Sequence, residues 1–290
     1  MFPVNYHKPA PSLRPYVQFY SQHQLKLRDP LFVHPVPARC APLLEFIFGD
    51  RFQVFYSGSS VATTTPRTVV VGMQTRAYAQ LRLQGALQSF VIVFHPVGMQ
   101  RLFPVDLREL TGHDYDSRLV LGNPISELDE RLADCRSFQE RVKIADAFLT
   151  RRIPDRLTRD RIALAADCVV LNDGRVRIPD LASSIGISQR QFEREFDARF
   201  GMRPKLFARI VRFQAALDRK ARSNTKSWTD VAHEFGYYDQ MHLIHDFEEF
   251  TAGTPTETLR VLEAFFREQI RLVQIGIGAK DPRLVPRFLI

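Results

Sequence analysis

The sequence predicts an α+β protein with an N-terminal β-barrel, a small helical subdomain, and a C-terminal all-α part in which a linker helix joins two helix-turn-helix units. Three observations support this fold class. Short β-rich runs fill the first part of the chain, a helical pattern then replaces them, and one two-helix pattern occurs twice near the end. A chain of 290 residues is long enough for two hydrophobic cores.

The β-rich runs lie between Met1 and Gly122 and are separated by clusters of Pro, Gly, Asp and Thr. They read VQFYSQHQLKL, LLEFIFG, RFQVFYSG, TVVVGMQ, AYAQLRLQG and QSFVIVFHP. Several strands at this spacing favour a barrel or a sandwich over an alternation of strands and helices.

From Pro124 to Thr150 apolar residues recur at helical spacing, so helices should complete a first domain of residues 1–150. These helices either cover the barrel or serve dimerisation. The segment 151–157, RRIPDRL, contains a proline and is mostly charged, which predicts a linker. A helix should then run from Thr158 to Leu171 and stop at the following Asn-Asp-Gly.

The repeated pattern occupies Ile178–Lys205, the first unit, and Ser227–Pro255, the second unit. Each unit has a short amphipathic helix, a glycine turn at Gly186 or Gly236, and a longer helix whose phenylalanines share one face. This is the layout of a helix-turn-helix, whose second helix enters the major groove of DNA. Two copies about fifty residues apart make a stronger signal than one.

The stretches DLASSIGISQRQFEREF, FGMRPKLFARIVRFQAAL and VAHEFGYYDQMHLIHDFEEFTAGTP resemble the AraC/XylS family of bacterial transcription regulators. The resemblance covers roughly Leu157 to Leu262. It implies a DNA-binding domain of residues 158–262 behind a cupin-like sensory barrel. It also implies double-stranded DNA as partner, a homodimer, RNA polymerase as a further partner of an activator, and a cytoplasmic, nucleoid-associated location in bacteria.

Base readout is expected mainly from the long helix of the first unit, because Arg pairs well with guanine and Gln with adenine. Ser188 should cap this helix, with Gln191 completing a capping box. The predicted DNA-binding residues are Ser188, Gln189, Arg190, Gln191 and Arg194 in the first unit, Gln240, Met241, His242 and His245 in the second, and Arg209 and Arg212 between them. The last two suit phosphate contacts or packing, and for the first-unit arginines phosphate contact or simple solvation is the alternative to base contact.

Charge distinguishes the two units. The stretch Ser188–Arg222 has 10 basic and 4 acidic residues, a net +6, whereas Trp228–Leu262 has 1 basic and 7 acidic residues, a net −6. In the second long helix, His245 and the pair Glu248–Glu249 replace basic residues that are usual in the family. The first unit should therefore dominate DNA affinity. His242 and His245 either add a modest pH sensitivity or form an ordinary polar face.

An effector is implied by the resemblance, but no motif identifies it. Glu45, within the apolar run LLEFIF, is either an inward anchor for a ligand or a solvated residue. Arg152 and Arg156 have a spacing that some cyclic-dinucleotide receptors use, although the same spacing recurs elsewhere in this arginine-rich chain and chance explains it. The alternative to a small-molecule effector is a DNA-binding module regulated by a protein partner.

Other classes of function receive little support from the sequence. Cys40, Cys135 and Cys168 are widely spaced and read as free thiols, without a disulfide framework. His233, His242 and His245 lack a further ligand with metal-binding spacing, so no metal or cofactor is expected. No motif of a catalytic site occurs, which argues against an enzyme. No membrane span is expected either, and the role of the tail 263–290 stays open.

Overall fold

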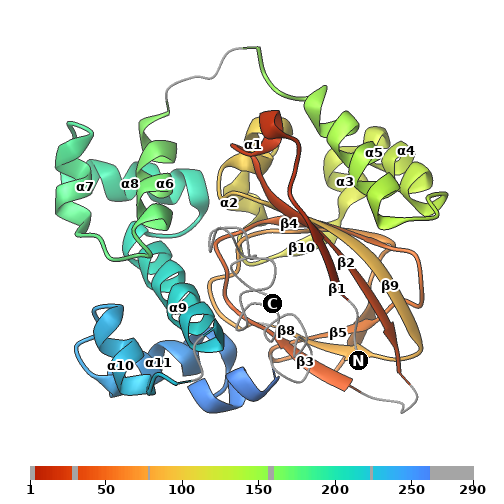
Figure 1. Cartoon of the computed structure of the whole chain (residues 1–290). Helices are drawn as coiled ribbons and strands as arrows, with labels where there is room; N and C mark the ends of the chain where they lie inside the picture. The colour runs from red at the N-terminus through yellow and green to blue at the C-terminus, as the bar shows by residue number, and fades with distance from the viewer. Residues whose placement is uncertain (1–3, 28–31, 78, 156–159, 223–224, 262–290) are drawn as a thin grey trace.

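The computed structural model describes residues 4–27, 32–77, 79–155, 160–222 and 225–261, and Figure 1 gives their arrangement. Two antiparallel sheets form the N-terminal domain. The six runs expected to be strands correspond to β2, β4, β5, β7, β8 and β9. The first sheet has the spatial order β1 (Val4–His7), β2 (Val17–Lys26), β9 (Ala86–Phe94), β4 (Leu43–Ile47), β7 (Thr68–Val71) and β10 (Asp114–Asp116).

The second sheet has the order β3 (Phe32–Val36), β8 (Ala79–Leu83), β5 (Gln53–Tyr56) and β6 (Ala62–Thr64). Within the described ranges, the strands therefore form two open sheets and no single closed barrel, which corrects the expectation from the sequence. The segment that leads from β3 to β4 contains Pro37 and Pro42. Proline has no backbone N–H, so it limits the ladder bonds that would join the two sheets there.

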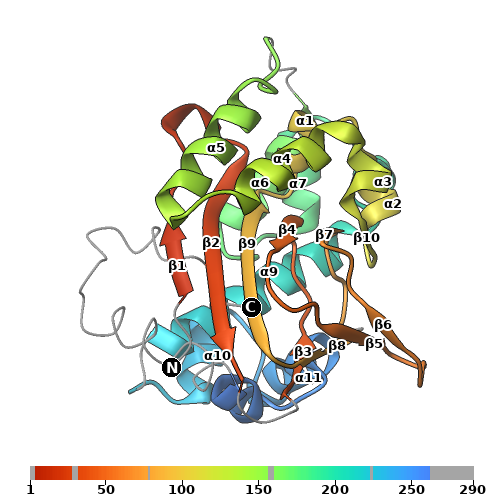
Figure 2. The ribbon, with the colours of Figure 1, turned by 90° about the vertical axis from the view of Figure 1, so that its right-hand side faces the viewer.

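Helices cover the outer face of the first sheet (Figure 2). The ring of Phe138 packs 6.0 Å from that of Phe90 on β9, and the Tyr20 hydroxyl on β2 donates to Asp146 at 2.7 Å. The helices of this domain are η1 (Pro11–Leu13), α1 (Gly98–Leu102), α2 (Leu107–Leu110), α3 (Ser117–Leu121), α4 (Asn123–Ala133) and α5 (Phe138–Thr150). Because side chains alternate along a strand, Glu45 lies on the opposite, inner face, which turns towards the second sheet.

The C-terminal part is all-helical. Its long helix α9 links two smaller helical groups (Figure 1). The helices are α6 (Arg161–Leu171), α7 (Ile178–Ser184), α8 (Gln189–Phe200), α9 (Pro204–Arg222), α10 (Trp228–Glu234) and α11 (Gln240–Thr251). The phenylalanines spaced along α8 and α11 are fully buried, as their period predicts. A further helix covers 255–261. The predicted extension of this helix to Phe266 or Val273, the tail 263–290 and Arg156 lie outside the described residues.

The two parts of the chain are packed together. Helix α2 of the N-terminal domain lies against α8, and the buried apolar residues form one continuous core. None of the helices in the described ranges is long and apolar enough to cross a membrane.

Candidate nucleic-acid interface

The turns of the two units have the same geometry. In the first unit the Ile187 N–H donates to the Ala182 carbonyl at 3.1 Å, and in the second the Tyr237 N–H donates to the Ala232 carbonyl at 2.9 Å. The residue before each donor is a glycine with positive φ, +74° at Gly186 and +68° at Gly236. This left-handed cap ends α7 and α10 and turns the chain into the next helix.

The long helix of the first unit starts as expected, with one difference. The Ser188 hydroxyl accepts from the Gln191 N–H at 3.2 Å. The Gln191 side chain does not return to Ser188 but donates forward to Glu195 at 2.8 Å. The expected capping box is therefore only half formed, because an (i, i+4) partner on the helix holds the glutamine.

The outer face of α8 matches the side chains proposed for base readout. Gln189, Arg190 and Arg194 are exposed, and Gln191 is half-buried. Glu193 accepts from the Gln189 amide at 2.7 Å. This bond orients the Gln189 side chain along the helix, while both arginines extend from the same exposed face.

The second unit presents a different face. Gln240, Met241, His242 and His245 are all exposed at the start of α11, whose first turn is capped by Asp239. The Thr229 hydroxyl donates to the Gln240 side-chain oxygen at 2.7 Å, which leaves the amide nitrogen of Gln240 facing outward. The His245 ring lies 3.6 Å from the Glu248 carboxylate. This face has histidines and carboxylates where the first unit has arginines.

Arg209 and Arg212 do not resemble free phosphate ligands. Both reach the carboxylate of Asp246, which has no exposed surface. Arg209 donates to Asp246 and to Glu249, each at 2.6 Å, and Arg212 lies 4.4 Å over the ring of Tyr237. Although burial opposes it, these carboxylates raise the pKa of Arg209. The geometry favours the packing role over the phosphate role for both arginines.

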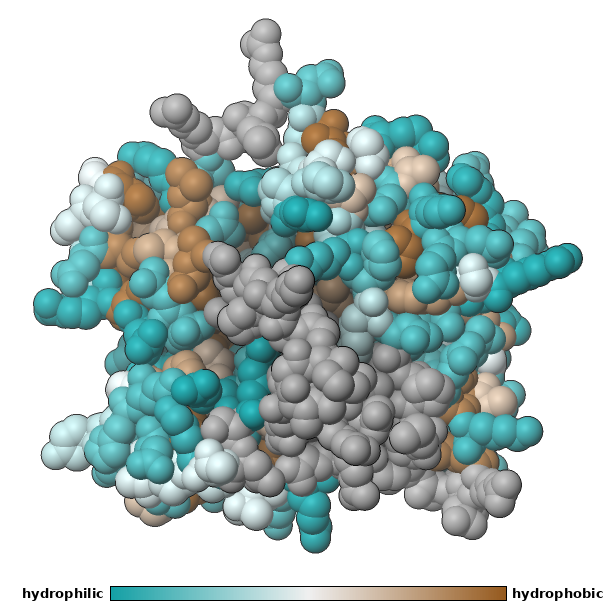
Figure 3. All heavy atoms as spheres, viewed as in Figure 1, coloured by the Kyte–Doolittle hydropathy of each residue, from teal (hydrophilic) through white to brown (hydrophobic). Residues whose placement is uncertain are grey.

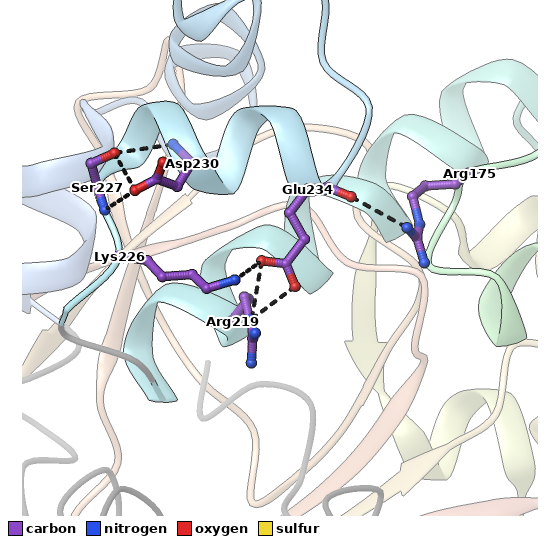
Figure 4. Close-up of polar contacts among 6 residues, drawn as sticks. All are labelled: Arg175, Arg219, Lys226, Ser227, Asp230 and Glu234. Carbon is purple, nitrogen blue, oxygen red and sulfur yellow. Dashed lines mark hydrogen bonds and ion pairs between the residues drawn. The ribbon is translucent and has the colours of Figure 1, made fainter.

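A similar ionic cluster holds α10 in place (Figure 4). Glu234 accepts from Lys226 at 2.6 Å and pairs with Arg219 of α9 at 2.9 Å, while its backbone carbonyl accepts from Arg175 at 3.2 Å. Burial alone would raise the pKa of Glu234, but Lys226 and Arg219 outweigh it and lower the pKa. At the start of the helix, Ser227 and Asp230 form a complete capping box.

Some of the opposite charges therefore hold the two units together. Arg209, Arg212 and Arg219 belong to the basic stretch, and their partners Asp246, Glu249 and Glu234 belong to the acidic one. Sequence reasoning treated the acidic residues only as a handicap near phosphate and did not identify Asp246 as an anchor. The one available signal was its place on α11, four residues before Phe250 and within the apolar stripe.

The viewed face of the molecule is mostly hydrophilic, but an apolar strip follows α6 (Figure 3). Leu164 and Leu171, which lie one heptad apart on this helix, are 54% and 79% exposed. Apolar side chains offer phosphate oxygens no partner, so this surface of α6 is unsuited to DNA.

Among the described residues, the inner face of the first sheet holds the effector candidate Glu45. Glu45 pairs with Val91, and the buried Ser21 and Ser89 and the half-buried His23 follow on the same face by register. Burial raises the pKa of Glu45, against the smaller opposing effects of the Ser89 hydroxyl and Arg39. Glu45 thus shares this face with Ser89, and its role as a ligand anchor stays a prediction.

Arg152 has a structural explanation. Its guanidinium lies 3.6 Å from the ring centroid of Phe148 and 5.5 Å from that of Phe103, and it donates to the Phe148 carbonyl at 3.1 Å. Burial lowers its pKa. These contacts occupy the side chain, and nothing supports the cyclic-dinucleotide hypothesis. In the described part of the chain, no three His, Cys, Asp or Glu side chains gather as a metal site.

Comparison with known families accounts for both parts of the chain. Residues 181–260 match a family model described as a helix-turn-helix domain, of the AraC type. This match supports placing the C-terminal part of the chain with the AraC/XylS regulators and supports a DNA-binding regulator. Residues 5–116 match a domain of unknown function, DUF6597. No curated protein sequence matches the chain.

Solved structures with a similar fold come from Vibrio cholerae. The apo form of a ToxT variant aligns with a TM-score of 0.50 and 11% identity, covering 83% of this chain and 97% of that one. ToxT in another crystal form aligns with a TM-score of 0.49 and 12% identity, covering 89% and 98%. ToxT bound to an unsaturated fatty acid aligns with a TM-score of 0.47 and 15% identity, covering 89% and 94%. At these identities the first alignment shows a shared fold.

Proposed function

We propose that this AraC/XylS-family protein is a sequence-specific transcription regulator that reads DNA mainly through α8. The exposed face formed by Gln189, Arg190 and Arg194 carries this proposal, because these side chains can form paired hydrogen bonds with base edges. The second unit adds contacts through the amide nitrogen of Gln240 and through Met241, His242 and His245. Ser188 and Gln191 contribute at the start of α8.

The experiment that tests this proposal compares operator binding by one arginine variant and one histidine variant. A duplex selected by the protein from random sequence serves as the operator. Arg194→Ala should weaken operator binding about tenfold or more, by the loss of one bidentate base contact, and His245→Ala should change it far less. Equal losses in a gel-shift or anisotropy titration would refute the dominance of the first unit.

We also propose that a small molecule bound on the inner face of the first sheet controls the regulator. The support is a carboxyl group, two serine hydroxyls and an imidazole that share one face across β2, β9 and β4, with Glu45 on β4. Such groups suit a ligand that offers hydrogen-bond donors. Protein purified from its native host should release this molecule on denaturation, as detected by mass spectrometry, and Glu45→Gln should release less. Recovery of equal amounts from both proteins would place the ligand elsewhere.

The remaining parts of the proposal concern the cellular role. The protein acts in the bacterial cytoplasm, at the nucleoid, as a homodimeric activator that contacts RNA polymerase, and it performs no catalysis. Transcription in vitro from a promoter carrying the selected operator should rise when the protein is added. A fall in transcript would assign it to repression.

A further inference from the structure

The last turns of α8 and α11 each hold a carbonyl group that has no partner inside its own helix. Phe200 ends α8 and Phe250 lies in the last turn of α11, where backbone carbonyls have no helical N–H to accept from. In both units the N-terminal domain supplies the missing donor. The Thr111 hydroxyl lies 2.7 Å from the Phe200 carbonyl and 2.9 Å from the Leu107 carbonyl of its own helix, so Phe200 is the nearer of two acceptors for its one proton. The Ala38 N–H donates to the Phe250 carbonyl at 2.8 Å.

A further hydrogen bond from the N-terminal domain reaches α9, the helix between the units. The Cys40 thiol donates to the Phe207 carbonyl near the start of α9, at 3.7 Å. Burial raises the pKa of this thiol, which keeps its proton in place. The backbone of Gly201 also approaches α2 so closely that a Cβ atom there would lie 3.1 Å from the Arg108 carbonyl oxygen.

The donors belong to one hydrogen-bonded unit, which we call the clasp: residues 38–40, 72–74 and 111–113. Arg39 and Gln74 exchange two backbone bonds of 2.8 Å, and the Gly112 N–H donates to the Met73 carbonyl at 2.7 Å. The fully buried Gln74 side chain donates to the Gly72 carbonyl at 3.1 Å. A shift at one end of the clasp is therefore transmitted to the other.

We infer that the clasp is a positioning device for DNA binding, which fixes α8 and α11 relative to one another before the protein meets DNA. The clasp holds the C-terminal ends of both helices, while Arg190 and Arg194 on α8 and His242 and His245 on α11 stay exposed. Pre-set geometry lowers the ordering cost of engaging two half-sites at once, and it brings no gain when only one half-site is present. The inference rests on the proposed function, in which both units contact DNA.

Thr111→Val tests this inference, because valine keeps the shape of threonine and removes the hydroxyl. Two duplexes are needed: the full operator selected from random sequence, and one in which the half read by α11 is randomised. We expect Thr111→Val to weaken full-operator binding about fivefold, the effect of one lost hydrogen bond, and to leave half-site binding unchanged. Thr111→Ser restores the hydroxyl and should restore full-operator affinity.

Thr65→Val is the matched control. Thr65 is equally buried, and its hydroxyl donates to the Phe52 carbonyl at 3.1 Å entirely within the N-terminal domain. The Thr65→Val variant should lower the melting temperature as Thr111→Val does, and it should leave the ratio of full-site to half-site affinity unchanged. If Thr111→Val leaves the ratio of full-site to half-site affinity unchanged, Thr111 has only a structural role. If it raises full-site affinity, the clasp opposes DNA binding. Either result overturns the inference. Failure to select any DNA sequence would instead refute the proposed function.

Discussion

Asp246 lies at the junction of the long connecting helix and the second helix-turn-helix unit. It is fully buried and paired with Arg209 and Arg212, and the ring of Tyr237 lies beside Arg212. A buried charge is tolerated only when its partners offset the loss of water. This buried ion pair therefore helps to hold the second unit on α9, together with the ion pairs of Glu249 and Glu234 and with apolar packing.

Asp246→Asn should destabilise the protein by about 3 kcal/mol, because it removes a buried carboxylate that pairs with Arg212 and leaves Glu249 as the remaining carboxylate beside Arg209. Glu248→Gln, on the exposed side of the same helix, should cost less than about 0.5 kcal/mol. Urea unfolding of both variants measures the difference. Similar small losses would show that α11 is held mainly by its phenylalanines.

The protonation of His23 should make the free energy of unfolding depend on pH. Burial lowers its pKa to about 4 from an ordinary value of 6.5. The unfolded chain therefore binds a proton in this window that the folded chain does not, so the free energy of unfolding rises with pH and is lost as pH falls from 6.5 towards 4. Replacing His23 with Gln should flatten this part of the stability profile, and an unaltered profile would exclude His23 as its source.

At the scale of elements, the two units share one turn geometry but differ in what surrounds their helices. Helix α8 ends at a glycine pressed against α2, whereas the turn glycines Gly186 and Gly236 have no heavy atom near the position of a Cβ. All three glycines have a positive φ, but of these three only Gly201 also contacts the N-terminal domain.

Substitutions at Gly186 and Gly201 separate these two effects. Gly186→Ala should cost about 1 kcal/mol, the price of a left-handed conformation for an L-residue. Gly201→Ala should cost roughly 2–3 kcal/mol, because it adds crowding against the Arg108 backbone. Thermal unfolding provides the measurement. Equal costs would mean that α2 moves away without penalty.

At the scale of the whole molecule, the buried residues of both parts form one core, and the clasp joins them by hydrogen bonds. Contacts shared across a boundary make two domains unfold together. Arg209, Arg212 and Arg219 pair with carboxylates of the second unit, whereas Arg190 and Arg194 stay exposed on α8.

Coupled unfolding can be followed at two places. Trp228, the single tryptophan, reports on the C-terminal part, and the buried thiol of Cys40 reports on the N-terminal side of the boundary. In a background with the other two cysteines replaced by serine, fluorescence and thiol labelling should change at the same urea concentration. A separate, earlier transition of either probe would show that the domains unfold independently.

The sequence by itself determined the local structure and the class of function. Glycine turns, phenylalanine stripes and caps specify helices and strands through neighbours a few residues apart, so the six strand runs, the two helix-turn-helix units and the family resemblance could all be recognised. Only the tertiary structure decided what depends on distant contacts: two open sheets in place of a closed barrel, Glu45 on an inner face, Arg209 and Arg212 bound to Asp246, and Thr111 at the end of α8. A charge has no partner in a sequence pattern; the fold supplies one, and that partner decides whether an arginine is free to meet DNA.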